Sequence, residues 1–261
     1  DFRSVGATEN IILASIYAEG ITTITNSAMQ PEIVDLANCL NKMGAKIEGA
    51  GTKVIQIEGV KKLKDISYTV MADRIEAGTL LCAGAITGGN ICINYKTPDH
   101  ITPIINKLEE AGCKIQIAKG KICLQAPKRL KAVDIKTMPY PGFPTDMQSI
   151  FVSILTIAKG TSVVVENIFE NRYRYVAEIK RMGARITTEG KTAIIKGVRK
   201  LSGAKVKSTD LRGGACLVLA GLAARGTTTV TNIEYILRGY EKLDEKLKKL
   251  GAKIKIENDD K

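Results

Sequence analysis

One aspartate of this 261-residue sequence follows a loop that is rich in proline. Asp146 comes directly after Pro139–Thr145, a stretch with three prolines and one glycine. Because each proline fixes its own φ and limits the residue before it, such a loop is stiff. A carboxylate held in a fixed place can accept a proton from a substrate hydroxyl. The sequence therefore makes Asp146 a candidate general base.

The same aspartate also has a simpler interpretation. Four residues of capping type open apolar, helix-like stretches: Ser4, Asp73, Asp146 and Asp210. Serine and aspartate are favoured helix N-caps, worth about 1 kcal/mol each. We therefore expect caps at Ser4, Asp73 and Asp210, and a further role in organising a site stays open for the two aspartates. For Asp146 the proline-rich loop favours chemistry.

The charge balance favours anionic partners. Lys and Arg number 39 against 27 Asp and Glu, a formal net charge of +12. Such an excess suits phosphates, nucleotides, carboxylates or nucleic acid. A nucleic-acid-binding module is the weakest of these alternatives, because the basic residues are spread over the chain and no helix-turn-helix or RNA-binding signature occurs. Taken singly, each arginine is more often a solvated surface charge.

Cysteine and histidine offer little for a metal centre. His100 is the only histidine, and no two cysteines form a CxxC pair, so the sequence predicts no metal site. The cysteines lie in apolar patterns, and we expect small buried hydrophobes in a reducing cytoplasm. No uninterrupted apolar run is long enough to span a membrane. The cysteines are Cys39, Cys82, Cys92, Cys113, Cys123 and Cys216.

The elements that position these residues form an internal repeat. A Gly-Ala-Lys-Ile-like turn begins at Gly44, Gly112, Gly183 and Gly251, at intervals of 68, 71 and 68 residues. A second glycine precedes each turn by 23 to 25 residues, at Gly20, Gly89, Gly160 and Gly226. Each unit is predicted as helix, strand, second helix and two further strands, which is an α/β architecture.

Three of the four units also have room for a leading strand. We expect these strands over Ile66–Met71, Val133–Thr137 and Ala204–Ser208. The first unit has none, because Ser4 already opens its helix. The repeat therefore predicts an N-terminally truncated chain, with one incomplete unit over 1–69 and three units forming a domain over 70–261.

Several motifs are identified as those of a known enzyme family. Phe143–Gln148, Glu170–Arg172, Thr209–Arg212 and Arg238–Glu241 closely resemble the bacterial UDP-N-acetylglucosamine 1-carboxyvinyltransferases, and Ser4–Thr8 and Pro31–Asp35 match as well. The resemblance runs to the C-terminus. The sister family, 3-phosphoshikimate 1-carboxyvinyltransferase, shares the repeated unit but not this set of loops. It is kept as an alternative.

The resemblance implies an inside-out α/β barrel fold built of βαβαββ units, with helices inside and sheets outside. This chain resembles the last four of six units. Residues 1–69 would be the last, incomplete unit of the N-terminal, UDP-side domain, and 70–261 the complete three-unit domain. The family's general acid and its phosphoenolpyruvate-site lysine belong to the absent N-terminal segment, which is therefore an expected partner.

The implied reaction transfers the enolpyruvyl group of phosphoenolpyruvate to the 3'-hydroxyl of UDP-N-acetylglucosamine and releases phosphate. It is the first committed step of peptidoglycan synthesis, in the bacterial cytoplasm, and needs no cofactor. The alternative is a catalytically inactive substrate-binding or structural fragment of that enzyme. We expect the fragment alone to be inactive.

The resemblance also assigns roles to residues. Asp146 matches the position that contacts and deprotonates the sugar hydroxyl, and Arg238 is expected to act with it in catalysis. Substrate binding is implied for Arg172 and Arg212 in the cleft, for the backbone of Ile168, and for the UDP-contacting segment Ser4, Val5 and Gly6. Arginine suits this task because its planar guanidinium binds carboxylate or phosphate in a bidentate manner. Gly213 and Gly214, where other members carry larger residues, are expected to loosen a helix start.

Overall fold

The computed structural model describes residues 2–257 and divides into two compact units. Unit 1 comprises Asp1–Ala72 together with residues 139–142, and unit 2 comprises Asp73–Met138 and Phe143–Lys261. The division of the main chain thus falls after Ala72, whereas the sequence placed it after residue 69. Each unit has its own hydrophobic core.

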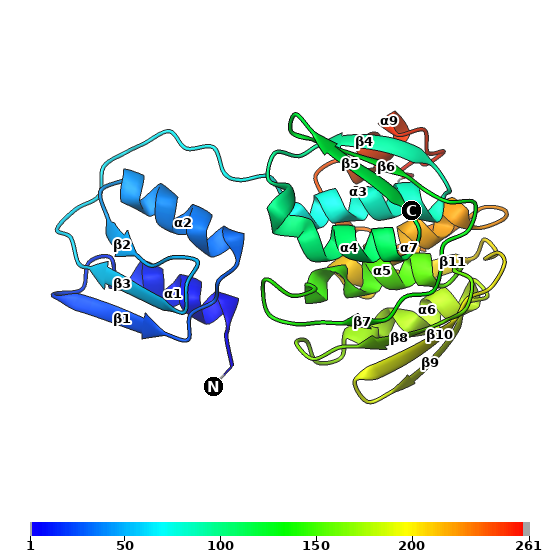
Figure 1. Cartoon of the computed structure of the whole chain (residues 1–261), viewed down its shortest axis with the longest axis horizontal. Helices are drawn as coiled ribbons and strands as arrows, with labels where there is room; N and C mark the ends of the chain where they lie inside the picture. Colours follow the sequence, from blue (N-terminus) through cyan, green and yellow to red (C-terminus); the bar gives the residue numbers. More distant parts are fainter. Residues whose placement is uncertain (1, 258–261) are drawn as a thin grey trace. The chain divides into compact units, whose positions relative to one another are not determined.

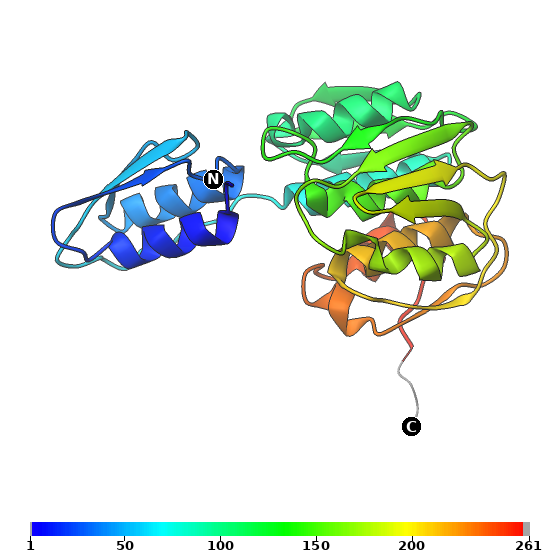
Figure 2. The ribbon, with the colours of Figure 1, turned by 90° about the horizontal axis from the view of Figure 1, so that it is seen from below.

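Unit 1 is a small sheet with two helices. Its elements are α1 (Val5–Ser15), β1 (Ile21–Thr25), α2 (Pro31–Lys42), β2 (Lys46–Glu48) and β3 (Val54–Glu58). The strands form an antiparallel sheet in the order β1-β3-β2. Figure 2 shows α1 and α2 side by side on one face of it. Ile12, Ile33 and Ile55 are fully buried between the helices and the sheet.

Unit 2 contains two more copies of the same arrangement and, within the described residues, a third copy that lacks the last two strands. Its helices are α3 (Arg74–Ile86), α4 (Thr102–Glu110), α5 (Gln148–Leu155), α6 (Val176–Arg181), α7 (Leu211–Ala223), α8 (Glu234–Leu237) and α9 (Leu243–Lys249). Its strands are β4 (Asn90–Asn94), β5 (Lys114–Ala118), β6 (Lys121–Gln125), β7 (Ile135–Lys136), β8 (Thr161–Val165), β9 (Arg185–Glu189), β10 (Thr192–Lys196), β11 (Lys205–Lys207) and β12 (Thr229–Thr231). They form separate sheets ordered β4-β6-β5, β7-β8-β10-β9 and β11-β12.

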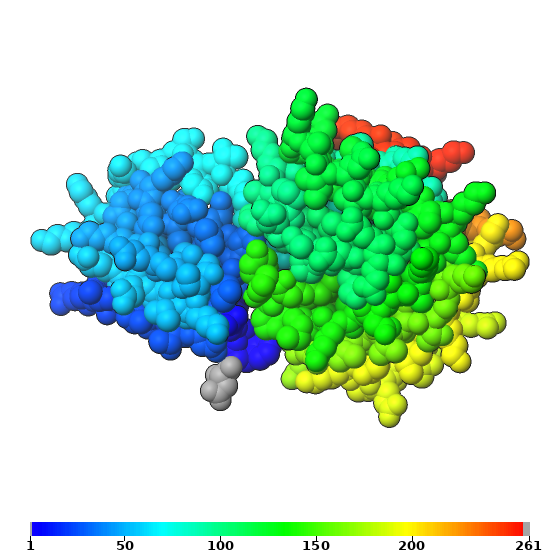
Figure 3. Space-filling view, in the orientation of Figure 1, coloured from blue at the N-terminus to red at the C-terminus, as the bar shows by residue number. Residues whose placement is uncertain are grey.

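Three helices fill the middle of unit 2. In Figure 1, α3, α5 and α7 lie between the sheet β4-β6-β5 and the sheet β7-β8-β10-β9, and the three helices pack against one another. All eight residues of α5 are buried. Segments drawn in green and yellow form most of the visible surface of unit 2 (Figure 3). The predicted arrangement of helices inside and sheets outside is therefore present in unit 2.

The repeat predicted from the glycines is confirmed. Helix, strand, helix and two strands follow one another in that order in the first three copies. All four turn glycines, Gly44, Gly112, Gly183 and Gly251, have φ between 93° and 104°, a backbone conformation that side chains disfavour. Each of them directly follows the C-terminal end of a second helix, where a glycine in this conformation ends the helix.

Two predicted strand regions are wrong. Ile66–Met71 forms no strand, because it is attached to unit 1: the Tyr68 hydroxyl donates to Asp35 Oδ1 at 2.9 Å and the Met71 amide donates to Asp35 Oδ2 at 3.2 Å. Within the described residues, 252–257 also form no strand after α9.

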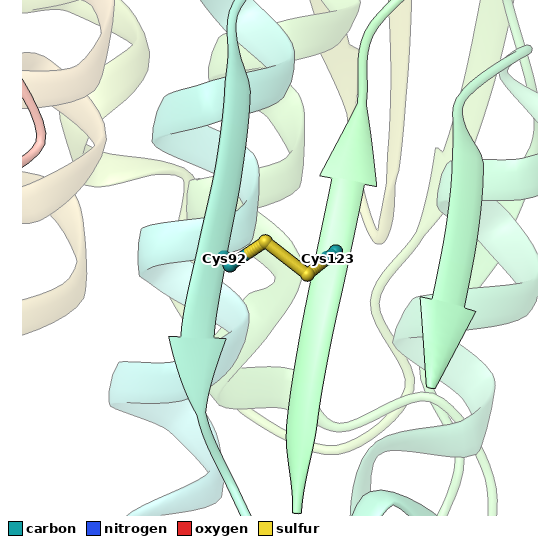
Figure 4. Close-up of a disulfide and its surroundings, with 2 residues drawn as sticks. All are labelled: Cys92 and Cys123. Carbon is teal, nitrogen blue, oxygen red and sulfur yellow. A yellow bond between two sulfur atoms is a disulfide. The ribbon is translucent and has the colours of Figure 1, made fainter. Parts of the chain in front are cut away.

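The expectation for the cysteines is correct for three of them. Cys82, Cys113 and Cys216 are buried, and burial raises the pKa of the Cys113 thiol to about 11, so it is a poor nucleophile. Cys92 and Cys123 instead face each other across β4 and β6 and form a disulfide (Figure 4). The apolar pattern Ile91-Cys92-Ile93 hid this pair, because alternate residues of a strand face opposite sides and Cys92 is on the exposed side.

Candidate active site

The three residues predicted as helix caps do cap helices. The Ser4 hydroxyl accepts the Ala7 amide at 3.2 Å and opens α1. Asp73 accepts two amides at the start of α3, at 2.7 and 3.0 Å. Asp210 Oδ1 accepts the amides of Arg212 and Gly213 at 3.0 and 2.9 Å at the start of α7. The capping hypothesis is confirmed for these three residues.

Asp146 does not cap its helix. It lies in the short 3-10 turn Thr145–Met147, and α5 begins two residues later with no side-chain cap. Its Oδ1 accepts from Arg172 Nη2 at 2.9 Å, and its Oδ2 accepts from Arg212 Nη2 at 3.3 Å. Both carboxylate oxygens are therefore engaged by cations from other elements. We call Asp146, Arg172 and Arg212 the Asp146 cluster.

The cations of this cluster are buried and the anion is not. The side chains of Arg172 and Arg212 are 8% and 14% exposed, whereas that of Asp146 is 42% exposed. Burial by itself raises the pKa of the Asp146 carboxyl, but the charges and hydrogen bonds of Arg212 and Arg172 outweigh it, so its pKa is lowered. Asp146 is thus an ionised carboxylate at neutral pH.

Neighbouring side chains orient the two guanidiniums. Arg172 Nε and Nη2 donate to Thr145 Oγ1 at 3.3 and 3.2 Å, and its guanidinium lies 4.2 Å from the ring centroid of Phe169. Arg212 lies 5.5 Å from the ring centroid of Tyr240. Aromatic faces attract cations at such distances. Tyr240 in turn shares a hydrogen bond of 2.9 Å with Thr79 of α3, so residues of the three central helices and their loops meet at this cluster.

Arg212 keeps an unused donor. Among the described residues, its buried Nη1 has no hydrogen-bond partner. The cluster contains two guanidiniums and one carboxylate, so one positive charge is left over. A buried donor without a partner is costly unless a ligand or water satisfies it. The arrangement can therefore accept a phosphate or carboxylate oxygen next to a carboxylate able to take a proton.

The remaining candidates, Arg238 and the segment Ser4–Gly6, lie at the ends of helices. Arg238 follows α8 directly and is exposed; within the described residues its guanidinium forms no hydrogen bond or ion pair. Ser4, Val5 and Gly6 open α1 in unit 1, and Ser4 and Gly6 are exposed there. Amides of a helix N-terminus attract anions.

Ile168 lies on a loop that is held by Glu166, a residue that the sequence did not mark as a candidate. Its amide donates to Glu166 Oε1 at 2.9 Å, so only its carbonyl is left for a ligand. The same oxygen accepts the Phe169 amide at 3.0 Å and the Thr137 hydroxyl at 2.8 Å. Glu166 is 3% exposed. An acidic residue directly after the apolar strand Thr161–Val165 was the available signal, and only the fold shows that its carboxylate turns inward.

The glycines after Arg212 lie where neighbouring side chains leave no room for a Cβ atom. A Cβ atom on Gly213 would lie 2.9 Å from Asp210 Oδ2, and one on Gly214 would lie 2.3 Å from Ser208 Oγ and 2.6 Å from Ile236 Cγ1. The absent side chains instead let α8, which precedes Arg238, approach α7 closely. The close packing gives these glycines a role that the sequence pattern does not reveal, and the expected loosening of the helix start stays a prediction.

Within the described part of the chain, no group of three or more His, Cys, Asp or Glu residues could hold a metal ion. Among the same residues, no helix has the length and apolarity to cross a membrane.

Solved structures identify the class of fold. The enolpyruvyl transferase NikO from Streptomyces tendae superposes with a TM-score of 0.87 at 27% identity, over 96% of this chain and 60% of that one. EPSP synthase from Acinetobacter baumannii gives a TM-score of 0.72 at 21% identity, over 98% of this chain and 62% of that one. The predicted fold is confirmed: it is the α/β fold of enolpyruvyl transferases.

Sequence comparison then gives the family. The model of the EPSP synthase (3-phosphoshikimate 1-carboxyvinyltransferase) family matches residues 1–247, and the chain belongs to this family. UDP-N-acetylglucosamine 1-carboxyvinyltransferase 1 of Caldanaerobacter subterraneus subsp. tengcongensis is 58% identical over 97% of this chain and 61% of its own length. The enzyme of the same name from Trichlorobacter lovleyi is 53% identical over the same shares. The chain thus spans about three fifths of the length of these relatives.

Proposed function

We propose that this chain provides the catalytic base and the anion-binding arginines of a UDP-N-acetylglucosamine 1-carboxyvinyltransferase. The observation that supports it most directly is the Asp146 carboxylate held between Arg172 and Arg212. In the reaction, a sugar hydroxyl adds to the central carbon of phosphoenolpyruvate, and phosphate then leaves. A proton acceptor and cations for phosphate and carboxylate are needed, and the cluster contains both.

Each residue of the cluster has one task in this proposal. Asp146 takes the proton of the 3'-hydroxyl as its oxygen attacks. Arg172 and Arg212 bind the phosphate or carboxylate oxygens of phosphoenolpyruvate, with Arg212 Nη1 as a donor ready for one of them. Arg238 adds a further cation for the phosphate-bearing intermediate. No residue of this chain is assigned as the acid that protonates the methylene carbon.

The sugar nucleotide is proposed to bind at two further places. Ser4, Val5 and Gly6 offer a helix N-terminus to the UDP phosphates. The Ile168 carbonyl is available as an acceptor, because its amide is already engaged by Glu166. Identities of 52–58% to enzymes named for UDP-N-acetylglucosamine, against 21–22% to solved EPSP synthases, favour this substrate over 3-phosphoshikimate.

The setting follows from the reaction. We propose a bacterial cytoplasmic transferase in the first committed step of peptidoglycan synthesis, hence an enzyme of cell-wall biogenesis linked to cell shape, cell cycle and division. Unit 1 would be the last unit of the UDP-side domain. The two substrates and the N-terminal segment found in the longer relatives are the proposed partners.

Complementation tests this function. We expect the 261-residue chain alone to release no phosphate from phosphoenolpyruvate and UDP-N-acetylglucosamine. Adding the N-terminal segment, covalently or as a separate fragment, should restore phosphate release. Replacing the sugar nucleotide by 3-phosphoshikimate in the same assay tests the sister activity. A folded complemented protein with neither activity would favour the inactive-fragment alternative.

Arg238 gives a second test of the assigned roles. In the complemented enzyme, Arg238→Ala should raise the KM for phosphoenolpyruvate by about tenfold or more, as loss of a charge-assisted contact does. The dissociation constant of UDP-N-acetylglucosamine should stay unchanged, which titration calorimetry can measure. Equal weakening of both substrates would contradict the assignment of Arg238 to the phosphate.

A further inference from the structure

The Asp146 cluster contains an anion of its own. The exposed fractions place Asp146, at 42%, on the solvent side of two guanidiniums that are 8% and 14% exposed. A ligand that arrives from solvent therefore meets the carboxylate before it meets the cations. A phosphate or carboxylate that binds both guanidiniums through Arg172 Nη2 and Arg212 Nη2 competes with Asp146 for these donors, while Arg212 Nη1 is open to a further oxygen.

The other acidic groups nearby are already committed. Asp210 Oδ1 accepts two backbone amides of α7, and its Oδ2 accepts the Thr209 hydroxyl at 3.0 Å. Asp73 accepts two amides of α3. Within the described residues, Asp146 is the carboxylate that forms ion pairs with Arg172 and Arg212. Among the described residues, Asp146 is therefore the one anion in direct ion-pair contact with both guanidiniums.

We propose that Asp146 is the displaceable internal counter-ion of Arg172 and Arg212, so that binding of a phosphate-bearing substrate and release of the base are one event. The inference rests on the proposed function for its catalytic meaning, but the exchange of anions is measurable without turnover. In the ligand-free protein the arginines hold the carboxylate. When an anion takes their donors, Asp146 is set free within reach of the same site.

The exchange explains how the carboxylate becomes a base. Two guanidiniums favour its ionised form and make it a weak proton acceptor. Once a substrate anion has neutralised them, the carboxylate holds a proton more readily. The hydroxyl proton then passes to Asp146 only when phosphoenolpyruvate is in place. Proton transfer from the sugar hydroxyl therefore follows the binding of phosphoenolpyruvate and does not precede it.

Binding of inorganic phosphate to the 261-residue chain tests the exchange. Asp146→Asn removes the internal anion and keeps the shape of the side chain, so phosphate should bind about tenfold more tightly than to the unaltered chain, a typical coupling between competing sites. Asp210→Asn is the matched control, because it removes one negative charge beside Arg212 while asparagine still caps the helix. It should change the affinity less than twofold.

Other outcomes would overturn the proposal. Unchanged or weaker phosphate binding by the Asp146 variant would mean that the carboxylate organises the arginines or has no part in anion binding. An equal gain in the Asp210 variant would mean that only the general charge matters. Binding by neither protein would mean that the arginine pair is no anion site.

A second measurement needs no variant and covers the case of misfolding. Saturating phosphate should raise the pKa of the Asp146 carboxyl in the unaltered chain, read from its ¹³C carboxyl shift. No change in that pKa would also overturn the exchange. If phosphate binds as expected but the complemented protein shows no transferase activity, the proposed function is wrong. The role of Asp146 as a displaceable counter-ion would then still hold.

Discussion

The N-termini of α5 and α7 begin with the same residue type and use it differently. At α7, both oxygens of Asp210 are occupied locally, by two amides of its own helix and by the Thr209 hydroxyl. At α5, Asp146 lies in a 3-10 turn before the helix, and its oxygens bind Arg172 and Arg212 from distant parts of the chain. Capping and ion pairing compete for the same two oxygens.

The difference shows how a repeat can produce an active site. Each copy supplies a short polar residue at the start of its first helix, where it stabilises the fold. In the third copy Asp146 lies one residue before the N-cap position of α5, within the 3-10 turn Thr145–Met147, so α5 has no side-chain cap. The carboxylate becomes available to other elements. A structural residue in one copy is thus a chemical residue in another.

The largest effect that we expect from the different roles of Asp146 and Asp210 is on turnover. In the complemented enzyme, Asp146→Ala should lower kcat by about 10²–10⁴-fold, the usual contribution of a positioned base, because no other group takes the hydroxyl proton. Binding of UDP-N-acetylglucosamine should weaken far less. Phosphate-release kinetics and calorimetry measure the two quantities. Unchanged turnover in a folded variant would reduce Asp146 to a structural residue like Asp210.

At α7 the largest effect should be on stability. Gly214→Ala adds a Cβ atom 2.3 Å from Ser208 Oγ and 2.6 Å from Ile236 Cγ1, so α7 and α8 must separate. We expect the free energy of unfolding to fall by about 1–3 kcal/mol, as for other overpacked sites. Urea unfolding measures it. Gly226→Ala is the control, because nothing lies within 4 Å of its added Cβ while its φ is +83°. It therefore measures backbone strain without overpacking.

Much of this architecture could be predicted from the sequence. The spacing of the glycines predicts the repeat, because a turn with positive φ strongly favours glycine. Local caps at Asp73 and Asp210 were equally predictable, since the hydrogen bonds run to amides two or three residues away. Both features depend on neighbours in sequence.

The rest depends on neighbours in space. Nothing in the local pattern reveals that Glu166 turns inward to bind Thr137, or that Cys92 faces Cys123, because strand register decides both. The stretch Ile66–Met71 has a strand-like pattern, yet Asp35 holds it to unit 1. That Arg172 and Arg212 belong with Asp146 came from the family resemblance rather than from spacing.

A smaller effect is expected from the cap itself. Asp210→Ala should lower the free energy of unfolding by about 1 kcal/mol, because two amides at the start of α7 lose their acceptor. Asp210→Asn should recover most of that loss, since asparagine caps equally well. Thermal or urea unfolding compares the three proteins. A loss for asparagine as large as for alanine would show that the charge of Asp210, rather than its hydrogen bonds, supports α7.

The smallest effect concerns pH and follows from the lowered pKa of the Asp146 carboxyl. The folded pKa of Asp146 lies below its unfolded value of about 3.9. Its ion pairs therefore contribute stability at pH values above about 3.9, and that contribution is lost as the pH falls through the lowered folded pKa. Solvent screens a carboxylate that is 42% exposed, so the contribution is modest. Urea unfolding of the unaltered chain and of Asp146→Asn should differ at pH 7, and the difference should shrink steadily as the pH is lowered below 4. A difference that stays constant with pH would show that Arg172 and Arg212 do not favour the ionised form of Asp146.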